Sequence, residues 1–431
     1  MTNGRPDRGL ALALAVAFVL RAGFALGYWR GQPLTHDEQE YLALALNLAA
    51  GRGFARDLPG AFEGPSVEHF ARPPLYPWFL AGVLRLAGQP LDRLPPSVPP
   101  VVQVVQAAVG TGGVWLVALL AGRVAGTRGR RAAAWTAAVY PPLVWLPAYA
   151  LSETIYSPLA LAAAWWLGSI LDGPAPASGA ASVTGVRPAL AAGVLAGLAA
   201  LARSSGLAFA GLAAAAVALR GRASLALALV LGTAAVVGPW TARNLVVFGR
   251  PILVAADGGV NVWIGNHPLA VGEGDLAANP ALKAAHVAFR DRLAHLTPEE
   301  REPHYYRAAL AWIREHPGAW LRLTAWKLFY TWVPAGPSYR SRSPLYFWTT
   351  VLSYGVLLAL AVAGLPALRA AASPPRALGV LLASAVLVNL ITFPQDRYRV
   401  PVIDPVLIVV AAAALARLTA SRRDAQGGGA R

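Results

Sequence analysis

Long apolar runs constrain the fold of this chain more than any other feature. A helix that crosses a bilayer needs about 20 mostly apolar residues, because the hydrocarbon core offers no water to exposed backbone groups. The sequence contains about ten such runs, and they predict an all-α integral membrane protein. The predicted spanning segments are 10–29, 99–121, 132–150, 154–171, 188–203, 205–220, 224–240, 345–366, 377–393 and 401–418.

The composition agrees with a membrane protein and argues against nucleic-acid binding. Only 13% of the 431 residues are charged, whereas soluble domains are about a quarter charged. The net charge of +16 comes mostly from arginines, which fall between apolar runs as orientation signals do. No nucleic-acid recognition module accompanies them. The first apolar run has no small-x-small cleavage site, so we expect a retained signal anchor.

The arginines also predict the orientation of the chain in the membrane. If both termini are cytoplasmic, the arginine-rich short loops lie inside, as expected. This topology requires that the apolar run 73–88, which opens with two prolines, lies at the interface and does not span. Two long outer segments remain, at about 30–98 and 241–343, and they hold all 7 histidines and most of the acidic residues. We therefore expect an extracytoplasmic site.

The same topology predicts three parts of the chain. Residues 1–240 form a transmembrane catalytic module that contains the first outer loop. Residues 241–343 form an outer lid, with helix-forming stretches at 280–296 and 299–316. Residues 344–431 form the last spanning helices and a short cytoplasmic tail. The Ala/Gly/Ser/Pro-rich segment 172–186 is typical of a flexible linker.

Carboxylates cluster directly after the first spanning segment, in THDEQEYLALALNLAAGRGF (35–54). Asp37 and Glu38 precede an apolar face at helical spacing, which predicts an interfacial helix. Acidic residues in a first turn also stabilise the helix dipole, so a structural role is an equal alternative to that of a general base. Glu153, in LSETIY, is a second candidate, either as an intramembrane carboxylate or as part of a helix cap.

Several arginines lie at the outer ends of helices, where positive charge is unexpected. Arg72 stands before Pro-Pro, and a guanidinium at this depth suits either a phosphate ligand or lipid headgroups. Arg243 follows GPWTA, and Arg397 and Arg399 lie in FPQDRYRVPVIDP. Repeated exceptions to the orientation rule indicate an anionic ligand on this face.

Taken in order, NLAAGRGF, ARPPLYPWF, LSETIY, PWTARN, the GNHP loop and RYRVPVIDP resemble motifs of the GT-C membrane glycosyltransferases. The similarity is to bacterial glycosyltransferase family 39, the group of protein O-mannosyltransferases and the lipid A aminoarabinose transferase. The resemblance implies a GT-C bundle with interfacial helices in the first outer loop. It also implies inverting transfer of a sugar from a polyprenyl-phosphate carrier to a lipid, glycan or protein acceptor.

The resemblance also implies roles for individual residues, and we give them here as expectations. Asp37, Glu38 and Glu153 are the catalytic candidates. The donor phosphate would be bound by Arg72, Arg243, Arg397 and Arg399. Substrate contacts are expected from Tyr41, Tyr76 and Asn266. No cofactor is certain; a divalent metal ion remains open, with Glu68 and His267 as candidate ligands.

Two other functions fit a polytopic protein with polar groups near helix ends. One is a transporter or flippase of lipid-linked sugars, although such proteins usually show internal repeats and broken helices at the midplane. The other is an oligosaccharide polymerase or ligase, which tends to have one dominant outer loop late in the chain. We find no clear internal repeat or charged or broken midplane helix in this chain, and polymerases and ligases do not usually have an acidic loop after the first helix.

Overall fold

Helices form all of the regular secondary structure in the described part of the chain. The computed structural model describes residues 7–58, 72–172, 183–334, 336, 343–369 and 375–427. The helices of the bundle are α1 (Arg8–Gly23, continued by the π-helix Phe24–Tyr28), α4 (Pro100–Val139), α5 (Pro141–Trp145, followed by the 3₁₀ turn Leu146–Ala148), α6 (Glu153–Leu171), α7 (Val183–Ala202), α8 (Gly206–Ala218), α9 (Ala223–Phe248), α15 (Pro344–Arg369), α16 (Arg376–Ile391) and α18 (Ile403–Gly427). The remaining helices are α2 (His36–Ala49), α3 (Leu75–Leu86), α10 (Gly258–Gly265), α11 (Pro280–Arg292), α12 (Pro298–Glu315), α13 (Pro317–Trp332) and α17 (Asp396–Arg399).

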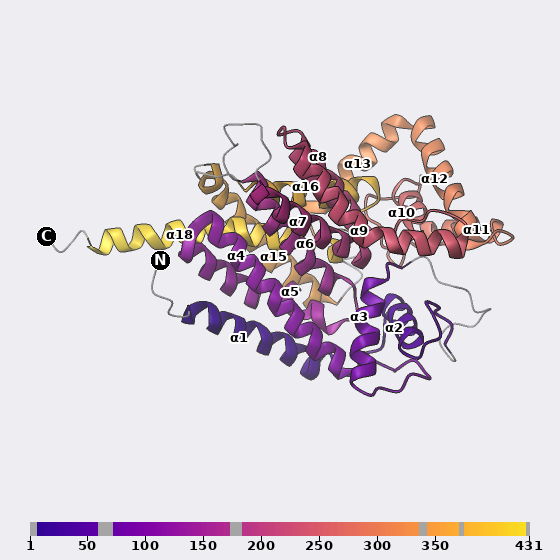
Figure 1. Ribbon diagram of the computed structural model, residues 1–431, viewed down its shortest axis with the longest axis horizontal. Helices are drawn as coiled ribbons and strands as arrows, with labels where there is room; N and C mark the ends of the chain where they lie inside the picture. Colours follow the sequence, from indigo (N-terminus) through magenta and orange to yellow (C-terminus); the bar gives the residue numbers. More distant parts are fainter. Residues whose placement is uncertain are drawn as a thin grey trace.

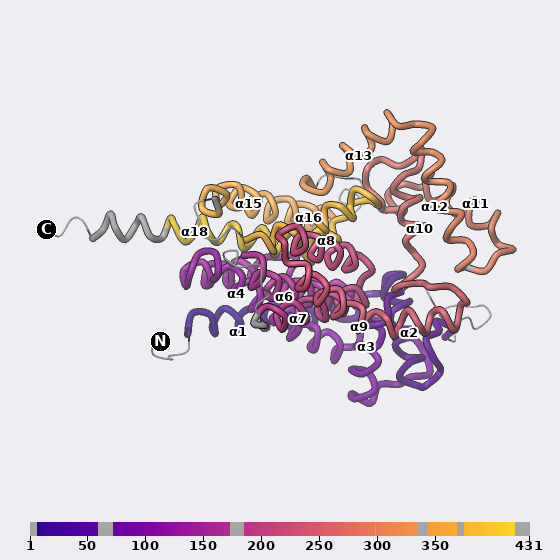
Figure 2. Tube along the Cα trace, turned by 45° about the horizontal axis from the view of Figure 1, so that its top comes forward, coloured from indigo at the N-terminus to yellow at the C-terminus, as the bar shows by residue number. Residues whose placement is uncertain are grey.

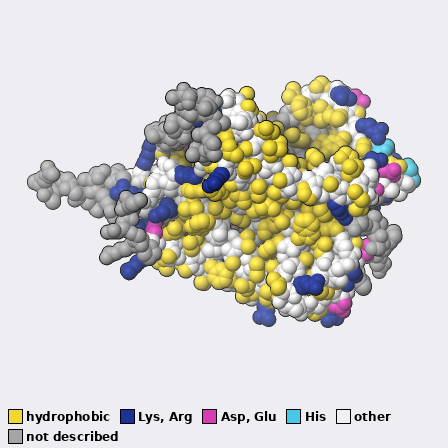
Figure 3. All heavy atoms as spheres, viewed as in Figure 1, with side chains coloured by type: hydrophobic (Ala, Val, Ile, Leu, Met, Phe, Trp, Pro, Cys, Tyr) yellow, Lys and Arg dark blue, Asp and Glu magenta, His cyan; other side chains and the backbone are white. Residues whose placement is uncertain are grey.

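An all-α membrane protein is confirmed by the length and character of these helices. Among the described residues, 6 helices are long and apolar enough to cross a membrane. They are α1 with its π-helical end, α4, α6, α7, α9 and α15. The other predicted spanning segments correspond to α8, α16, α18 and the second half of α4. Apolar side chains cover the middle of the molecule in the view of Figure 3, and the visible histidines lie at its right-hand end.

The helix α4 is two helices joined at a sharp turn. Gly126 has a φ of 62°, which a residue without a Cβ adopts at little cost, and Ala125 beside it is also non-helical. The turn lies within the region between the two predicted segments. Past it, Arg130 and Arg131 each form an ion pair of 2.8 Å with Asp7, which caps α1. These contacts fasten the start of α1 to the second half of α4.

That second half is shorter than the predicted segment 132–150, because two prolines interrupt it. The helix ends at Val139, and Pro141 and Pro142 begin the short α5. In a continuous helix, the amides of residues 141 and 142 would donate to the carbonyls of Ala137 and Ala138, but proline has no amide hydrogen. The prediction of one helix to residue 150 is therefore wrong.

An arginine within the bundle satisfies the two carbonyls that the prolines leave without partners. Arg21 of α1 donates to the Ala137 oxygen at 3.0 Å and to the Ala138 oxygen at 3.3 Å. Its side chain is 1% exposed. A basic group near the last carbonyls of a helix also interacts favourably with the helix dipole. Arg21 thus acts as a cap supplied by a neighbouring helix.

The non-spanning helices gather at one end of the bundle. In Figure 1, α1 begins and α18 ends at the left, whereas α2, α3 and α10 to α12 lie at the right. The 12-residue α3 is about 18 Å long and too short to cross, so the predicted interfacial helices of the first outer loop are present. Figure 2 shows α10 to α13 beside one another at this same end.

Two details differ from the sequence-based expectations. The predicted linker 172–186 ends earlier, because α7 begins at Val183; residues 173–182 lie outside the described residues. The glycine-rich loop 257–275 begins with α10, which Asp257 precedes at the N-cap position. The predicted stretches 280–296 and 299–316 correspond to α11 and α12.

Candidate active site

The first turn of α2 fixes one of the predicted carboxylates in a structural position. Thr35 and Glu38 form a capping box, in which the Thr35 amide donates to Glu38 Oε2 at 2.8 Å. The other Glu38 oxygen accepts from the Ala150 amide at 2.9 Å. Glu38 is 1% exposed. Both oxygens are therefore engaged by backbone groups, and Glu38 joins α2 to the loop before α6.

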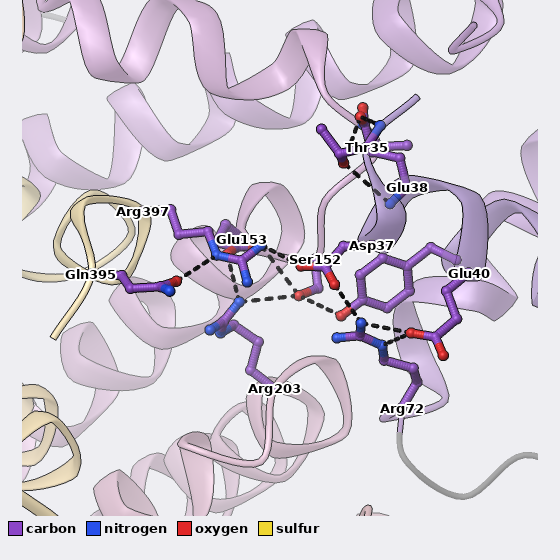
Figure 4. Close-up of polar contacts among 12 residues, drawn as sticks. Thr35, Asp37, Glu38, Glu40, Arg72, Ser152, Glu153, Arg203, Gln395 and Arg397 are labelled. Carbon is purple, nitrogen blue, oxygen red and sulfur yellow. Dashed lines mark hydrogen bonds and ion pairs between the residues drawn. The ribbon is translucent and has the colours of Figure 1, made fainter. Parts of the chain in front are cut away.

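Asp37, the preceding residue, points the other way and bridges two arginines. Its Oδ1 lies 2.5 Å from Arg72 Nη2, and its Oδ2 forms an ion pair with Arg397 Nη1. Figure 4 shows Arg72 and Arg397 reaching this region from opposite sides. Burial alone would raise the pKa of the Asp37 carboxyl, but the Arg72 and Arg397 guanidiniums outweigh burial and hold that pKa well below its usual range. Asp37 is consequently an anion at neutral pH.

Arg72 is fixed by a second carboxylate and an aromatic ring. Its Nε donates to Glu40 Oε2 at 2.7 Å, and its guanidinium lies 5.0 Å from the centre of the Tyr41 ring. Glu40 also pairs with Arg56 at 2.9 Å. Glu40 follows Asp37 by three residues, so the two carboxylates share one face of α2 and meet the same guanidinium.

A second ion pair lies beside the first, at the start of α6. Glu153 Oε1 is 2.6 Å from Arg203 Nη1, and Glu153 is 1% exposed. Ser152 connects the two halves of the site, because its hydroxyl accepts from the Tyr41 hydroxyl at 3.2 Å and donates to Glu153 at 3.4 Å. Figure 4 shows Ser152 and Glu153 between Arg203 and Asp37.

Three guanidiniums therefore converge on a small polar region from three distant parts of the chain. Arg203 and Arg397 also lie over the same ring, that of Tyr398, at 4.9 and 5.3 Å from its centre. Planar guanidiniums present several donors in a fixed fork, which matches phosphate oxygens better than an ammonium does. An alcohol near Asp37 would have a carboxylate to accept its proton.

Comparison with protein-family models finds no match, and comparison with curated proteins finds none either. Solved structures do match. ArnT from Cupriavidus metallidurans, bound to undecaprenyl phosphate, has a TM-score of 0.52 at 18% identity, covering 94% of this chain and 59% of that chain. The oligosaccharyltransferase AglB from Archaeoglobus fulgidus, in complex with an inhibitory peptide and a dolichol-phosphate, has a TM-score of 0.57 at 16% identity, covering 98% of this chain and 52% of that chain. This chain has the GT-C fold.

The GT-C fold confirms the fold expected from the sequence motifs. At this level of identity the likeness concerns the fold alone. The chain spans between half and three fifths of the length of these two solved proteins.

The predicted residues of this GT-C bundle fall into two groups. The structure brings Asp37, Glu153, Arg72, Arg397 and Tyr41 together. Tyr76 lies behind them, with its ring centre 4.9 Å from that of Tyr41 and its hydroxyl donating to Gln106 at 2.6 Å.

The other predicted residues have different partners. Arg399 pairs with the buried Asp404 at 2.8 Å and lies over Tyr354. Arg243 lies 4.7 Å from the centre of the Trp240 ring. Asn266 joins α10 to α13, because it accepts from Lys327 Nζ at 3.0 Å and donates to the Ile391 carbonyl.

The sequence-based prediction of the site missed Arg203 and its neighbour Asp257. Arg203 directly follows α7, which ends at Ala202, and the predicted segment 188–203 included it in a spanning helix. The signal that singled out Arg397, an arginine at an outer helix end, applies equally to Arg203. Asp257, at the N-cap of α10, is close enough to Arg72 and Arg203 to feel their charges. Burial raises the pKa of the Asp257 carboxyl, although Arg72 and Arg203 act in the opposite direction.

Of the two metal ligands implied by the resemblance, the structure describes only His267. Glu68 lies outside the described residues. His267 packs against Trp263, with ring centres 4.3 Å apart, and burial lowers the pKa of its imidazole. A different group, His36 with Asp37 and Glu40, brings its potential ligand atoms within 4.8 Å of one another. Arginines already engage both of these carboxylates, so the group is compatible with a divalent metal and does not require one.

Proposed function

We propose that this protein is an inverting glycosyltransferase that moves a sugar from a polyprenyl-phosphate carrier to a lipid, glycan or protein acceptor. The observation that carries the proposal is the meeting of Arg72, Arg203 and Arg397 around Asp37 and Glu153. It combines an anion-binding group with a carboxylate at one end of an apolar bundle. The GT-C fold supports the same class, because its solved examples include ArnT bound to undecaprenyl phosphate.

The proposed reaction assigns one step to each kind of side chain. Asp37 accepts the proton of the acceptor hydroxyl as the hydroxyl oxygen attacks the anomeric carbon of the sugar. The bond between that carbon and the phosphate oxygen breaks, and polyprenyl phosphate leaves with the electron pair. The arginines stabilise the charge that develops on the leaving phosphate, and in a site of low dielectric such stabilisation is strong. Glu153 holds Arg203 and, through Ser152, Tyr41 in place.

The location of the site follows from the same proposal. The end of the bundle that carries α2, α3 and α10 to α12 would face the extracytoplasmic side of a bacterial plasma membrane, and both termini would be cytoplasmic. Residues 241–343 would cover the site as a lid. The electrostatic effect of Arg72 and Arg203 on Asp257, at the start of α10, supports that placement.

A transfer assay in nanodiscs tests the proposal. Purified protein is supplied with radiolabelled polyprenyl-phosphate sugars and a membrane extract as the source of acceptors. We expect label to move into a new product with wild-type protein and not with Asp37→Asn. Asp291→Asn makes the same chemical change at a carboxylate of α11 that is 61% exposed, and it should transfer normally. In sealed proteoliposomes, intact donor that crosses the bilayer without forming a product would instead indicate a transporter and refute the proposal.

A further inference from the structure

Asp37, the carboxylate proposed as the base, accepts from the guanidinium N–H groups that would bind the phosphate of the donor substrate. Asp37 uses its two oxygens on two different guanidiniums, at 2.5 Å from Arg72 and in an ion pair with Arg397. A phosphate held between these arginines would use the same N–H groups. Figure 4 shows Asp37 lying where the two side chains converge. The carboxylate and the phosphate are therefore competitors for one pair of cations.

We propose that Asp37 is an internal substitute for the carrier phosphate, and that a bound donor displaces it from Arg72 and Arg397. This inference rests on the proposed function. It adds an order of events: the donor phosphate takes the guanidiniums first, and the freed carboxylate then turns to the acceptor hydroxyl. An acceptor or a water molecule that arrives before the donor meets a carboxylate whose two oxygens each already accept from a guanidinium.

The exposure of the neighbouring acids explains why Asp37 is the group that moves. Its side chain is 21% exposed, compared with 7% for Glu40 and 1% for Glu153. Glu40 also has a second cation, Arg56, and Glu153 is enclosed beside Arg203. Arg56 therefore holds Glu40 in place, and displacing Glu153 would leave a buried carboxylate without its ion pair, which is costly. Asp37 has solvent on one side and lies in the first turn of α2.

The same competition acts after transfer. The donor is a phosphodiester with one negative charge, whereas the released carrier is a phosphomonoester with a charge of about −1.5 to −2 near neutral pH. The product therefore binds the arginines more strongly than the donor does. Asp37 returns to the same two guanidiniums and lowers the affinity for the product, which favours its release.

The affinity for the carrier provides the test. Binding of radiolabelled undecaprenyl phosphate to the full-length protein in nanodiscs is measured for wild type and Asp37→Asn, with Asp37→Ala as a second variant. Removing the competitor should strengthen binding about tenfold or more, because the phosphate no longer has to displace a carboxylate from both Arg72 and Arg397. The variants proposed to be inactive would thus bind the carrier more tightly than the active enzyme.

Glu40→Gln is the matched control, because it removes the same charge from the same helix face and also contacts Arg72. It should change the affinity much less than Asp37→Asn does. In an Arg397→Gln background, the gain from Asp37→Asn should become smaller, since one of the two shared donors is gone. Two results would overturn this inference and leave the proposed function standing. One is carrier binding by Asp37→Asn and Asp37→Ala that is equal to or weaker than that of wild type. The other is a gain in affinity with Glu40→Gln as large as that with Asp37→Asn. Absence of carrier binding to every protein, wild type included, would refute the proposed donor class and this inference with it.

Discussion

Replacing Arg21 with methionine should destabilise the bundle, even though it removes a charge from an apolar environment. Arg21 is the donor to Ala137 and Ala138, whose helical partners would have been Pro141 and Pro142. Methionine fills a similar volume and donates nothing. The two carbonyls would then be buried without hydrogen bonds.

The magnitude follows from these two carbonyls. Each buried, unpaired polar group costs about 1–3 kcal/mol, which gives about 2–6 kcal/mol for the pair. The variant no longer pays the desolvation penalty of a buried guanidinium, which offsets part of this cost. That penalty includes the Arg21 Nε, which has no hydrogen-bond partner among the described residues. We therefore expect a net loss of about 2–4 kcal/mol in the free energy of unfolding.

Equilibrium unfolding in mixed micelles with increasing sodium dodecyl sulfate measures this loss. Arg8→Met is the matched control, because Arg8 lies on the same helix and is exposed, so the same substitution should change stability by less than about 0.5 kcal/mol. Arg21→Lys should fall between them, since an ammonium lacks the planar fork that reaches two carbonyls. A free energy of unfolding for Arg21→Met within about 0.5 kcal/mol of wild type would refute the capping role.

Further predictions concern the proposed site. Asp37→Asn should lower kcat by about 10²–10⁴-fold, the usual range for loss of a general base, without raising the KM for the donor; a raised KM would contradict the proposed competition. Arg203→Gln should raise the KM for the donor about tenfold, whereas Arg290→Gln on α11 should leave it unchanged in the same transfer assay. The pKa of Asp37 is lower in the folded protein than in the unfolded chain, so its ion pairs stabilise the fold above the unfolded pKa, near pH 4, and the stabilisation is lost as the pH falls further. The difference in unfolding free energy between wild type and Asp37→Asn should therefore be constant from pH 5 to 8 and shrink toward pH 3; a difference that grew on acidification would contradict the assignment. Arg399→Met should destabilise the protein by leaving the buried Asp404 unpaired, and the additional change Asp404→Leu should restore much of that stability; a large loss of carrier affinity in the double variant would instead place Arg399 in the phosphate site.

The sequence carried much of this architecture because apolar length and arginine position are local properties. They located the helices of the bundle and separated them from the two segments that carry the short helices, and they marked Arg72 and Arg397 as unusual. They could not give the direction of a side chain on a short helix. Arg397 and Arg399 are two residues apart on the four-residue α17, yet one pairs with Asp37 and the other with Asp404.

Other features depend on contacts between distant segments and leave little trace in the sequence. Glu38 and Asp37 are adjacent acids with different roles. The Ala150 amide, which is distant in sequence, donates to Glu38 and makes it a structural anchor, whereas Asp37 remains the candidate base. The orientation rule could have identified Arg203 as an arginine at an outer helix end, but its apolar neighbours led to its inclusion in the predicted spanning segment 188–203. Arg21 could not be interpreted from α1 alone, because its partners exist only where the prolines interrupt α4.

The partnership between Arg21 and α4 has a consequence for how the protein is made. The ribosome completes α1 more than a hundred residues before it reaches Ala137 and Ala138. Until then, α1 carries an arginine whose insertion near the centre of a spanning helix costs about 2.5–3.5 kcal/mol. The apolar residues of α1 must outweigh this cost alone, or the segment must wait at the translocon for α4. By either route, the arrival of α4 gives the Arg21 guanidinium its two carbonyl acceptors and so stabilises α1 in lipid.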